Sequence, residues 1–177
     1  MLDFNDHVVV VTGAGAGIGT GITQAFHEAG ARVALGDVRD ARSMVARGMR
    51  GKIITISSGA AQSGRVSTAH NCASKAGVVM FTMVLALELA RHHINVNTIA
   101  PGLVEVEGKI SPLTPEYVEA LVRQIPWGRA GSPRDIAGAA LFLASPLAEF
   151  ITGEVLAVNG GSAAGRAFLP LSTPRPS

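Results

Sequence analysis

A glycine-rich stretch, TGAGAGIG at residues 12–19, lies between a run of β-branched residues and a predicted helix. Glycine occupies every second position, at Gly13, Gly15, Gly17 and Gly19. Such glycines let the backbone turn tightly, so a pyrophosphate can approach the helix start at Ile18, where N–H groups and the helix dipole favour an anion. The spacing differs from the common GxGxxG, and a tight strand-to-helix connection is the alternative interpretation of the same residues.

Asp37 lies 18 residues beyond Gly19, at the end of the second predicted strand. A carboxylate at this place can accept hydrogen bonds from the ribose hydroxyls of NAD, and it repels the additional phosphate of NADP. Arg39 is close enough in sequence to soften that repulsion. We therefore expect a nicotinamide dinucleotide site that prefers NAD over NADP.

These residues need a scaffold in which strands and helices alternate. We expect strands at residues 7–11, 32–35, 52–57, 94–100 and 154–158. We expect helices at residues 18–29, 41–49 and 68–91, and two more that begin at Thr114-Pro115 and Ser132-Pro133, where a hydroxyl caps and proline occupies the first turn. The alternation predicts an α/β fold, a Rossmann-like doubly wound parallel sheet in one domain at residues 1–162, followed by a mobile tail at 163–177.

Composition excludes several classes of protein. Hydrophobic residues make up 47% of the 177 residues and charged residues 16%, which indicates a globular chain. A net charge of +2 does not indicate nucleic-acid binding. Cys72 is the single cysteine, so no disulfide can form within the chain, and we expect it to be a small buried residue. We find no signal peptide, metal-ligand pattern or apolar run of about 20 residues, and expect a soluble cytoplasmic protein without membrane contact.

Six segments in order along the chain resemble the motifs of the short-chain dehydrogenase/reductase family. They are TGAGAGIG at 12–19, KIITISSGAAQSG at 52–64, NCASKAGV at 71–78, INVNTIAPG at 94–102, IPWGRAGSPRDIAGAALFLASP at 125–146 and ITGEVLAVNGG at 151–161. The first resembles the family's TGxxxGxG turn, and NCASKAGV resembles its YxASKAG segment. The resemblance implies an oxidoreductase that moves a hydride between a nicotinamide dinucleotide and a secondary alcohol or ketone.

The resemblance also implies roles for individual residues. Ser58 would hydrogen-bond the substrate oxygen, and Lys75 would bind the nicotinamide ribose and lower the pKa of a catalytic tyrosine. The turn at Pro101 and Gly102 would lie beside the nicotinamide, with the backbone of Val104 available to its carboxamide. Val106 stands where the family often has a threonine that contacts the cofactor.

The position four residues before Lys75 departs from the family, because Asn71 replaces the catalytic tyrosine. An amide does not titrate near neutral pH and cannot act as a general acid or base. Tyr117 lies far away in sequence and is interpreted as a packing or loop residue. His70 points about 100° away from Asn71 on a helix and is interpreted as an exposed helix-start residue. We therefore expect impaired catalysis.

A second departure is a missing segment. Only 14 residues separate Asp37 from Lys52, and ARSMVARGM at 41–49 resembles the later part of a long family helix. Two strands and two helices of the family are thus absent, with a join near Asp40. We predict that strand 52–57 closes the sheet by pairing directly with strand 7–11. The alternatives are a strand drawn in from another chain and an unfilled gap of two strand spacings, roughly 9.6 Å.

Three functions remain open at this point. The first is an NAD-dependent oxidoreductase of reduced activity, the second a non-catalytic nucleotide-binding or interaction protein, and the third an inactive truncated form. The helix at 68–91 is apolar nearly all round between Val78 and Leu89, which predicts burial on most sides. By the family resemblance this helix pairs with its symmetry mate, so we expect a homo-oligomer, a dimer or a tetramer.

Overall fold

The computed structural model describes residues 2–5, 7–11, 17–34, 44–64, 66–106 and 114–165. The described strands form two groups of parallel strands. The first group pairs β1, Val8–Val10, with β2, Arg32–Ala34. The second has the order β3-β4-β5, with β3 at Gly51–Ile56, β4 at Ile94–Pro101 and β5 at Val155–Val158. The α/β class and the parallel direction of the strands are confirmed.

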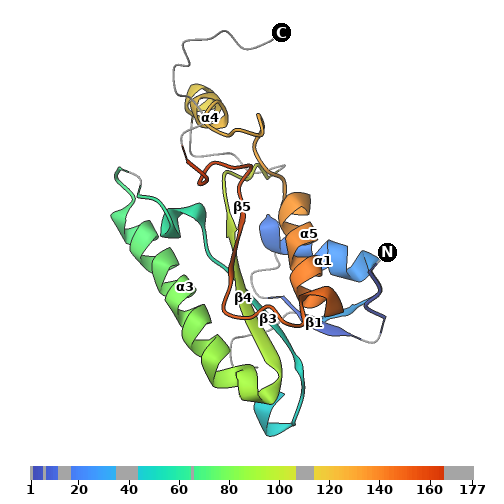
Figure 1. Ribbon diagram of the computed structural model, residues 1–177. Helices are drawn as coiled ribbons and strands as arrows, with labels where there is room; N and C mark the ends of the chain where they lie inside the picture. Colours follow the sequence, from blue (N-terminus) through green and yellow to red (C-terminus); the bar gives the residue numbers. More distant parts are fainter. Residues whose placement is uncertain are drawn as a thin grey trace, which may run out of the picture.

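Helices cover the strands on both sides (Figure 1). α3, Ala69–Leu89, lies on one face of β3-β4-β5, and α1, Ile18–Glu28, lies with α5, Pro133–Ala144, on the other. α4, Pro115–Val122, stands apart beyond the carboxyl end of β5. These bounds agree with the predicted elements within a few residues. Of the predicted helix at 41–49, residues 44–46 are helical and 41–43 lie outside the described residues, as do residues 166–177 of the predicted tail.

Side-chain caps begin two of the helices where the sequence predicted them. Thr114 Oγ1 accepts a hydrogen bond from the Tyr117 N–H at the start of α4. At the start of α5, Ser132 and Asp135 form a capping box, in which each side chain accepts a hydrogen bond from the other residue's backbone N–H. Arg129 donates two hydrogen bonds to the Asp135 carboxylate, at 2.8 and 2.9 Å. The Arg129 guanidinium and the Ser132 N–H hold the pKa of Asp135 well below its ordinary value of 3.8.

Above about pH 4, the Asp135→Asn variant is expected to have a free energy of unfolding about 0.5–1 kcal/mol lower than the parent, because it loses a charged helix cap. The effect is modest because solvent partly screens this charge. Because the folded-state pKa is lowered, the stabilisation is present above the ordinary pKa and is lost as the pH falls through the folded-state value. Urea unfolding of both proteins at about pH 7 and about pH 3 measures this, and the difference should shrink at the lower pH. Glu119→Gln, which removes an exposed ion pair with Arg123, is the control and should change stability little at either pH.

The predicted closure of the sheet is wrong. Among the described residues, β1 pairs with β2 and β3 pairs with β4, and no hydrogen bond joins β1 to β3. The physical reason lies in the helix layer, because α1 and α5 pack closely. A Cβ atom added to Gly21 would lie 2.6 Å from Pro133 Cβ. α5 in turn contacts β3, β4 and β5, while Ile22 and Phe26 of α1 join the core beneath β1, so α1 keeps β1 away from β3.

The surroundings of α3 also differ from the expectation that it is buried on most sides. Its buried side chains are Thr82, Ala86 and Leu89, along the face that packs on β3 and β4. Its exposed large apolar side chains are Met80, Phe81, Met83, Val84 and Leu87. Within the described residues, one helical stretch, Ala69–His92, is by length and composition sufficient to cross a membrane, although a soluble protein's helix passes the same test. This corrects the prediction that no apolar run approaches that length.

Candidate functional site

The carboxyl ends of β3, β4 and β5 carry two predicted site residues, Ser58 and Gly102, and two residues that were not predicted, Ser57 and Asn159. Ser57 and Ser58 follow β3, Gly102 follows β4, and Asn159 follows β5. Since the three strands are parallel, these ends meet at one edge of the sheet. In open α/β sheets, ligands bind outside this edge.

Two hydrogen bonds fix the second turn of α3 against the end of β3. Ser57 Oγ donates to the backbone oxygen of Lys75 at 2.8 Å, and Lys75 Nζ donates to the backbone oxygen of Ile56 at 3.3 Å. Ser57 is buried, with 3% of its surface exposed. The structure thus places the Lys75 ammonium at the strand end that Ser58 follows. Sequence reasoning missed Ser57, although its position directly before Ser58 was a usable signal.

Ser58 follows β3 and Asn71 lies on α3, the two elements that these hydrogen bonds join. Ser58 Oγ accepts a hydrogen bond from the Ala60 N–H at 3.2 Å, which begins a 3₁₀ turn, Gly59–Ala61, and the residue stays partly exposed. Asn71 is exposed and lies one helical turn before Lys75, on the same side of α3. Its side chain is therefore open to solvent and to ligands.

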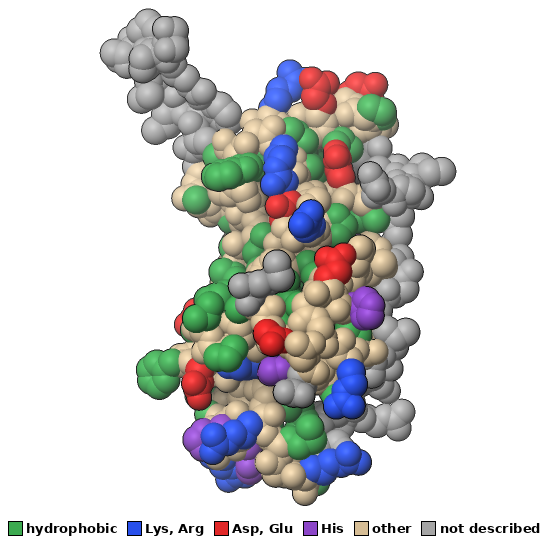
Figure 2. Space-filling view, turned by 90° about the vertical axis from the view of Figure 1, so that its right-hand side faces the viewer, with side chains coloured by type: hydrophobic (Ala, Val, Ile, Leu, Met, Phe, Trp, Pro, Cys, Tyr) green, Lys and Arg blue, Asp and Glu red, His purple; other side chains and the backbone are tan. Residues whose placement is uncertain are grey.

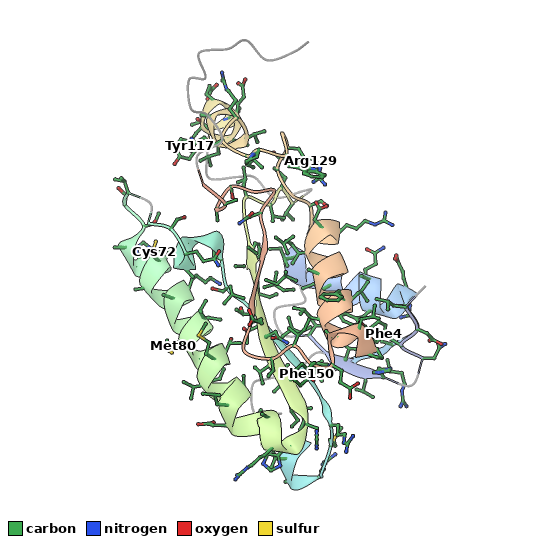
Figure 3. All side chains as sticks on the ribbon, in the orientation of Figure 1. Phe4, Cys72, Met80, Tyr117, Arg129 and Phe150 are labelled. Carbon is green, nitrogen blue, oxygen red and sulfur yellow. The ribbon has the colours of Figure 1, made fainter. Side chains whose placement is uncertain are left out.

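The alternatives to Asn71 are not brought to this place. Figure 3 shows Tyr117 on α4, well separated from the first turns of α3, where Cys72 is labelled. His70 is exposed at the start of α3. Cys72 is half-buried rather than buried, with its Sγ 3.4 Å from Thr68 Oγ1. The interpretation of His70 as an exposed residue at the helix start agrees with its position. The interpretation of Tyr117 as a packing or loop residue is wrong, because Tyr117 lies in α4 and is exposed.

The turn after β4 is held tightly against β5. The Gly102 N–H donates to the Val158 oxygen at 3.0 Å, and a Cβ atom on Gly102 would lie 2.8 Å from Asn159 Cβ and 2.9 Å from its Cα. Only glycine fits at this approach without a shift. Asn159 Nδ2 is buried and has no hydrogen-bond partner in the described part of the chain, which makes Asn159 a candidate that sequence reasoning missed.

Val104 lies on a short bridge beside this turn. Gly131 donates to the Leu103 oxygen and accepts from the Glu105 N–H, both at 2.9 Å. Because the bridge uses groups of the residues before and after Val104, the N–H and C=O of Val104 itself point to the opposite side. The contact of these groups with a nicotinamide carboxamide stays a prediction. Val106, two residues on, is half-buried.

The glycine-rich turn is described from Gly17 onward. Gly17 caps α1 with φ of 64°, a left-handed conformation that favours glycine, and Gly17 itself has no side chain to cap the helix start. Ile18 and Gly19 form the first turn, so their backbone faces the end of the helix where an anion is favoured. These features fit a dinucleotide pyrophosphate. The predicted residues Gly13, Gly15 and Asp37, with Arg39, lie outside the described residues.

Trp127 adds an apolar surface near the carboxyl end of β5. The backbone N–H of Trp127 donates a hydrogen bond to the Gly160 oxygen at 3.1 Å. The residue is 75% exposed. Trp127 lies in the segment 125–146 that resembles a family motif, but it was not predicted to be a site residue. No group of three or more His, Cys, Asp or Glu residues suited to a metal ion occurs in the described ranges.

Comparison with known proteins gives the following similarities. Residues 38–163 match the family model described as enoyl-(acyl carrier protein) reductase. The 3-oxoacyl-[acyl-carrier-protein] reductase of Vibrio cholerae is 46% identical over 121 residues, which are 66% of this chain and 49% of that protein. The corresponding reductase of Aquifex aeolicus is 44% identical over 111 residues, 63% of this chain and 44% of that protein. This chain therefore spans about half the length of the curated relatives it matches.

Solved structures show the same fold at lower identity. A short-chain type dehydrogenase/reductase from Mycobacterium marinum aligns with a TM-score of 0.84 at 25% identity, covering 92% of this chain and 98% of that chain. A 2-deoxy-d-gluconate 3-dehydrogenase from Agrobacterium tumefaciens, described with bound NADP, aligns with a TM-score of 0.80, 25% identity and the same two coverages.

Proposed function

We propose a function for this chain from the premise that it belongs to the short-chain dehydrogenase/reductase family. The function is an oxidoreductase that uses a nicotinamide dinucleotide to interconvert a secondary alcohol and a ketone, at a reduced rate. The observation that carries it is the position of Lys75, whose ammonium is fixed at the end of β3 beside Ser58 and one turn after Asn71.

The roles of the residues follow from their chemistry. When bound, the dinucleotide supplies or accepts the hydride. Ser58 Oγ, partly exposed at the strand end, donates a hydrogen bond to the substrate oxygen. Lys75 would bind the ribose hydroxyls of the dinucleotide, with its ammonium held at the end of β3 by the Ile56 oxygen, 3.3 Å away. Asn71 holds a water or the substrate but cannot deliver a proton, so the proton comes from water.

The relatives indicate which substrates to test first. The reductases of Vibrio cholerae and Aquifex aeolicus are named for 3-oxoacyl groups on acyl carrier protein, which carry a ketone within an acyl chain. The exposed Trp127 near the site offers an apolar surface for such a chain. We therefore propose 3-oxoacyl thioesters as substrates, with the gluconate-type ketones of the solved relatives as the comparison panel. Hydride transfer from NADH and NADPH to this panel tests the function.

NADH is expected to bind saturably but weakly, since Gly17 and the α1 start are present while the chain spans about half of its relatives. Calorimetric titration measures this, and no saturable binding up to millimolar concentration would contradict it. The preference for NAD rests on Asp37, although the Agrobacterium tumefaciens structure is described with bound NADP. Asp37→Ala should weaken NADH binding and spare or improve NADPH binding. A parent protein that binds NADPH more tightly would reverse the cofactor assignment.

The exposed side of α3 is expected to pair copies of the chain into a dimer or tetramer. Met80, Val84 and Leu87 are exposed together on this helix, and an apolar patch of this kind marks an interaction surface. Leu87→Asp should therefore lower the mass in light scattering at micromolar concentration to that of one chain. Val66→Asp, at a residue 91% exposed outside the helix, is the matched control and should leave the mass unchanged. A parent protein that is monomeric and folded would contradict the proposal.

A non-catalytic nucleotide-binding role is the second candidate, and Asn71 is the observation that favours it. Binding of NADH without transfer to any ketone of the panel would support this candidate over the first. For either function we propose a location in the cytoplasm. Cys72 is the single cysteine, so the chain forms no disulfide of its own, as is usual for cytoplasmic proteins.

A further inference from the structure

An open cleft of 2320 Å³ separates β1 from β3. Among the described residues, β1 pairs with no strand except β2 and β3 with none except β4, so each faces the cleft with an edge that no other strand pairs. On β3, the Ile56 oxygen accepts the hydrogen bond from Lys75 Nζ. An unpaired strand edge presents a row of N–H and C=O groups, which is a template for another extended segment.

The walls of the cleft come from both helix layers. Val78, Phe81 and Leu85 of α3 line one side, and Ile22 and Phe26 of α1 line the other. The cleft therefore passes through the layer of the sheet instead of lying on its surface. Apolar side chains lie open along it, with Val8 59% and Phe81 56% exposed. A segment between these walls has both faces covered, and strands covered on both faces are apolar at nearly every position.

One end of the cleft is basic. Its lining there includes Arg47, Arg50, Lys52, Arg91, His92 and His93, against the acidic Glu88 and Glu149. Burial lowers the pKa of Lys52, which Glu149 opposes, while Arg47, Arg50 and Arg91 are exposed. Figure 2 shows Lys, Arg and His side chains gathered at the lower end of the molecule, where Figure 1 places the starts of β3 and β4.

We propose that this cleft binds an extended apolar segment of another polypeptide, whose amino-terminal end carries acidic side chains. The direction follows from the described strands, which all pair in parallel. A segment parallel to β3 has its amino end beside Arg50, where opposite charge is favoured. Its length follows from β3, whose six residues span roughly 20 Å.

Peptide titration of the whole chain, without any dinucleotide, tests the proposal independently of the oxidoreductase activity. The probe is acetyl-Asp-Asp-Val-Ala-Val-Ala-Val-Thr-amide, which has two acidic residues followed by five apolar residues and a threonine. Saturable calorimetric binding is expected, together with slowed amide exchange in Val8–Val10 and Gly51–Ile56. The same peptide with N-methyl groups on its three valines lacks the donors along one edge, so it can pair with only one of the two strands and should bind more weakly.

A charge exchange tests the direction of the segment. Replacing the two aspartates of the probe by lysines should weaken binding about tenfold or more. The double variant Arg47→Glu and Arg50→Glu should bind the lysine peptide better than the aspartate peptide. Both substitutions are at exposed residues, so the fold should tolerate them.

Four outcomes would overturn the proposal. They are no saturable binding up to millimolar peptide, equal binding of the N-methylated peptide, a charge exchange without effect, and amide protection already complete in the peptide-free chain. In the last case, protection that rises with protein concentration shows that a second copy fills the cleft. Protection independent of concentration shows that the chain's own residues fill it.

Discussion

The Asn71→Tyr variant is expected to reduce ketones about 10²–10⁴-fold faster than the parent chain at saturating dinucleotide, the usual contribution of a positioned general acid. When hydride reaches a carbonyl carbon, the resulting alkoxide must take up a proton. Tyrosine at this position lies one turn before Lys75, whose ammonium stabilises a phenolate and so makes the hydroxyl a better acid. Because Asn71 is exposed on α3, the larger side chain can be accommodated without repacking the core. Steady-state rates of the two proteins measure the gain.

Asn71→Phe is the matched control, because it adds the ring without the hydroxyl and should give no gain. Lys75→Ala in the Asn71→Tyr background should remove most of the increase. If parent and Asn71→Tyr turn over equally fast and Lys75→Ala abolishes both activities, another residue supplies the proton. His70 would then be the first residue to replace, and the assignment of impaired catalysis would be wrong.

The Phe4→Ala variant is expected to lower the free energy of unfolding by about 3–5 kcal/mol, as for other buried aromatic residues. Phe4 is 1% exposed, and its ring contacts Phe26 of α1 and His7 edge-on, with ring centroids 5.2 Å apart in both pairs. Its N–H also donates to the Ala29 oxygen at 2.8 Å. Since β1 has no ladder to β3 among the described residues, such apolar contacts hold β1 and β2 to the rest of the fold.

Urea unfolding of Phe4→Ala and Phe150→Ala measures this effect. Phe150 is fully exposed, so the same change of side chain there should alter stability by less than about 0.5 kcal/mol. Similar losses of unfolding free energy in the two variants would show that the contacts of Phe4 do not hold β1 and β2 to the rest of the fold.

Local features of the chain were predictable from the sequence. The caps at Thr114 and Ser132, and the strands on either side of α3, lie where residue patterns indicate, because they depend on neighbours within a few positions. The gathering of Ser58, Lys75 and Gly102 at one edge was also predictable, since parallel strands bring their carboxyl ends together. Their individual catalytic roles stay predictions.

The order of the strands was not predictable in the same way. Closing the gap between β1 and β3 would add hydrogen bonds, but it would require α1 to leave its close packing on α5 at Gly21 and Pro133. No local sequence pattern indicates whether the β1–β3 hydrogen bonds or the α1–α5 packing is the more stabilising. For α3, the apolar run from Val78 to Leu89 indicates that the helix is buried, but not what buries it. The same apolar residues are expected whether the helix packs against a partner or against the chain's own core.

The packing of α1 on α5 has a consequence for synthesis on the ribosome. Gly21 and Pro133 are in contact range but lie 112 residues apart along the chain, so α1 is made long before the helix that covers it. At about 5–20 residues per second, roughly 6–22 s pass between the two. During this time Ile22 and Phe26 lack the α5 surface that buries them in the finished molecule. The apolar face of α1 is therefore without its cover until α5 has been made, and we expect chaperones that bind emerging polypeptides to recognise it.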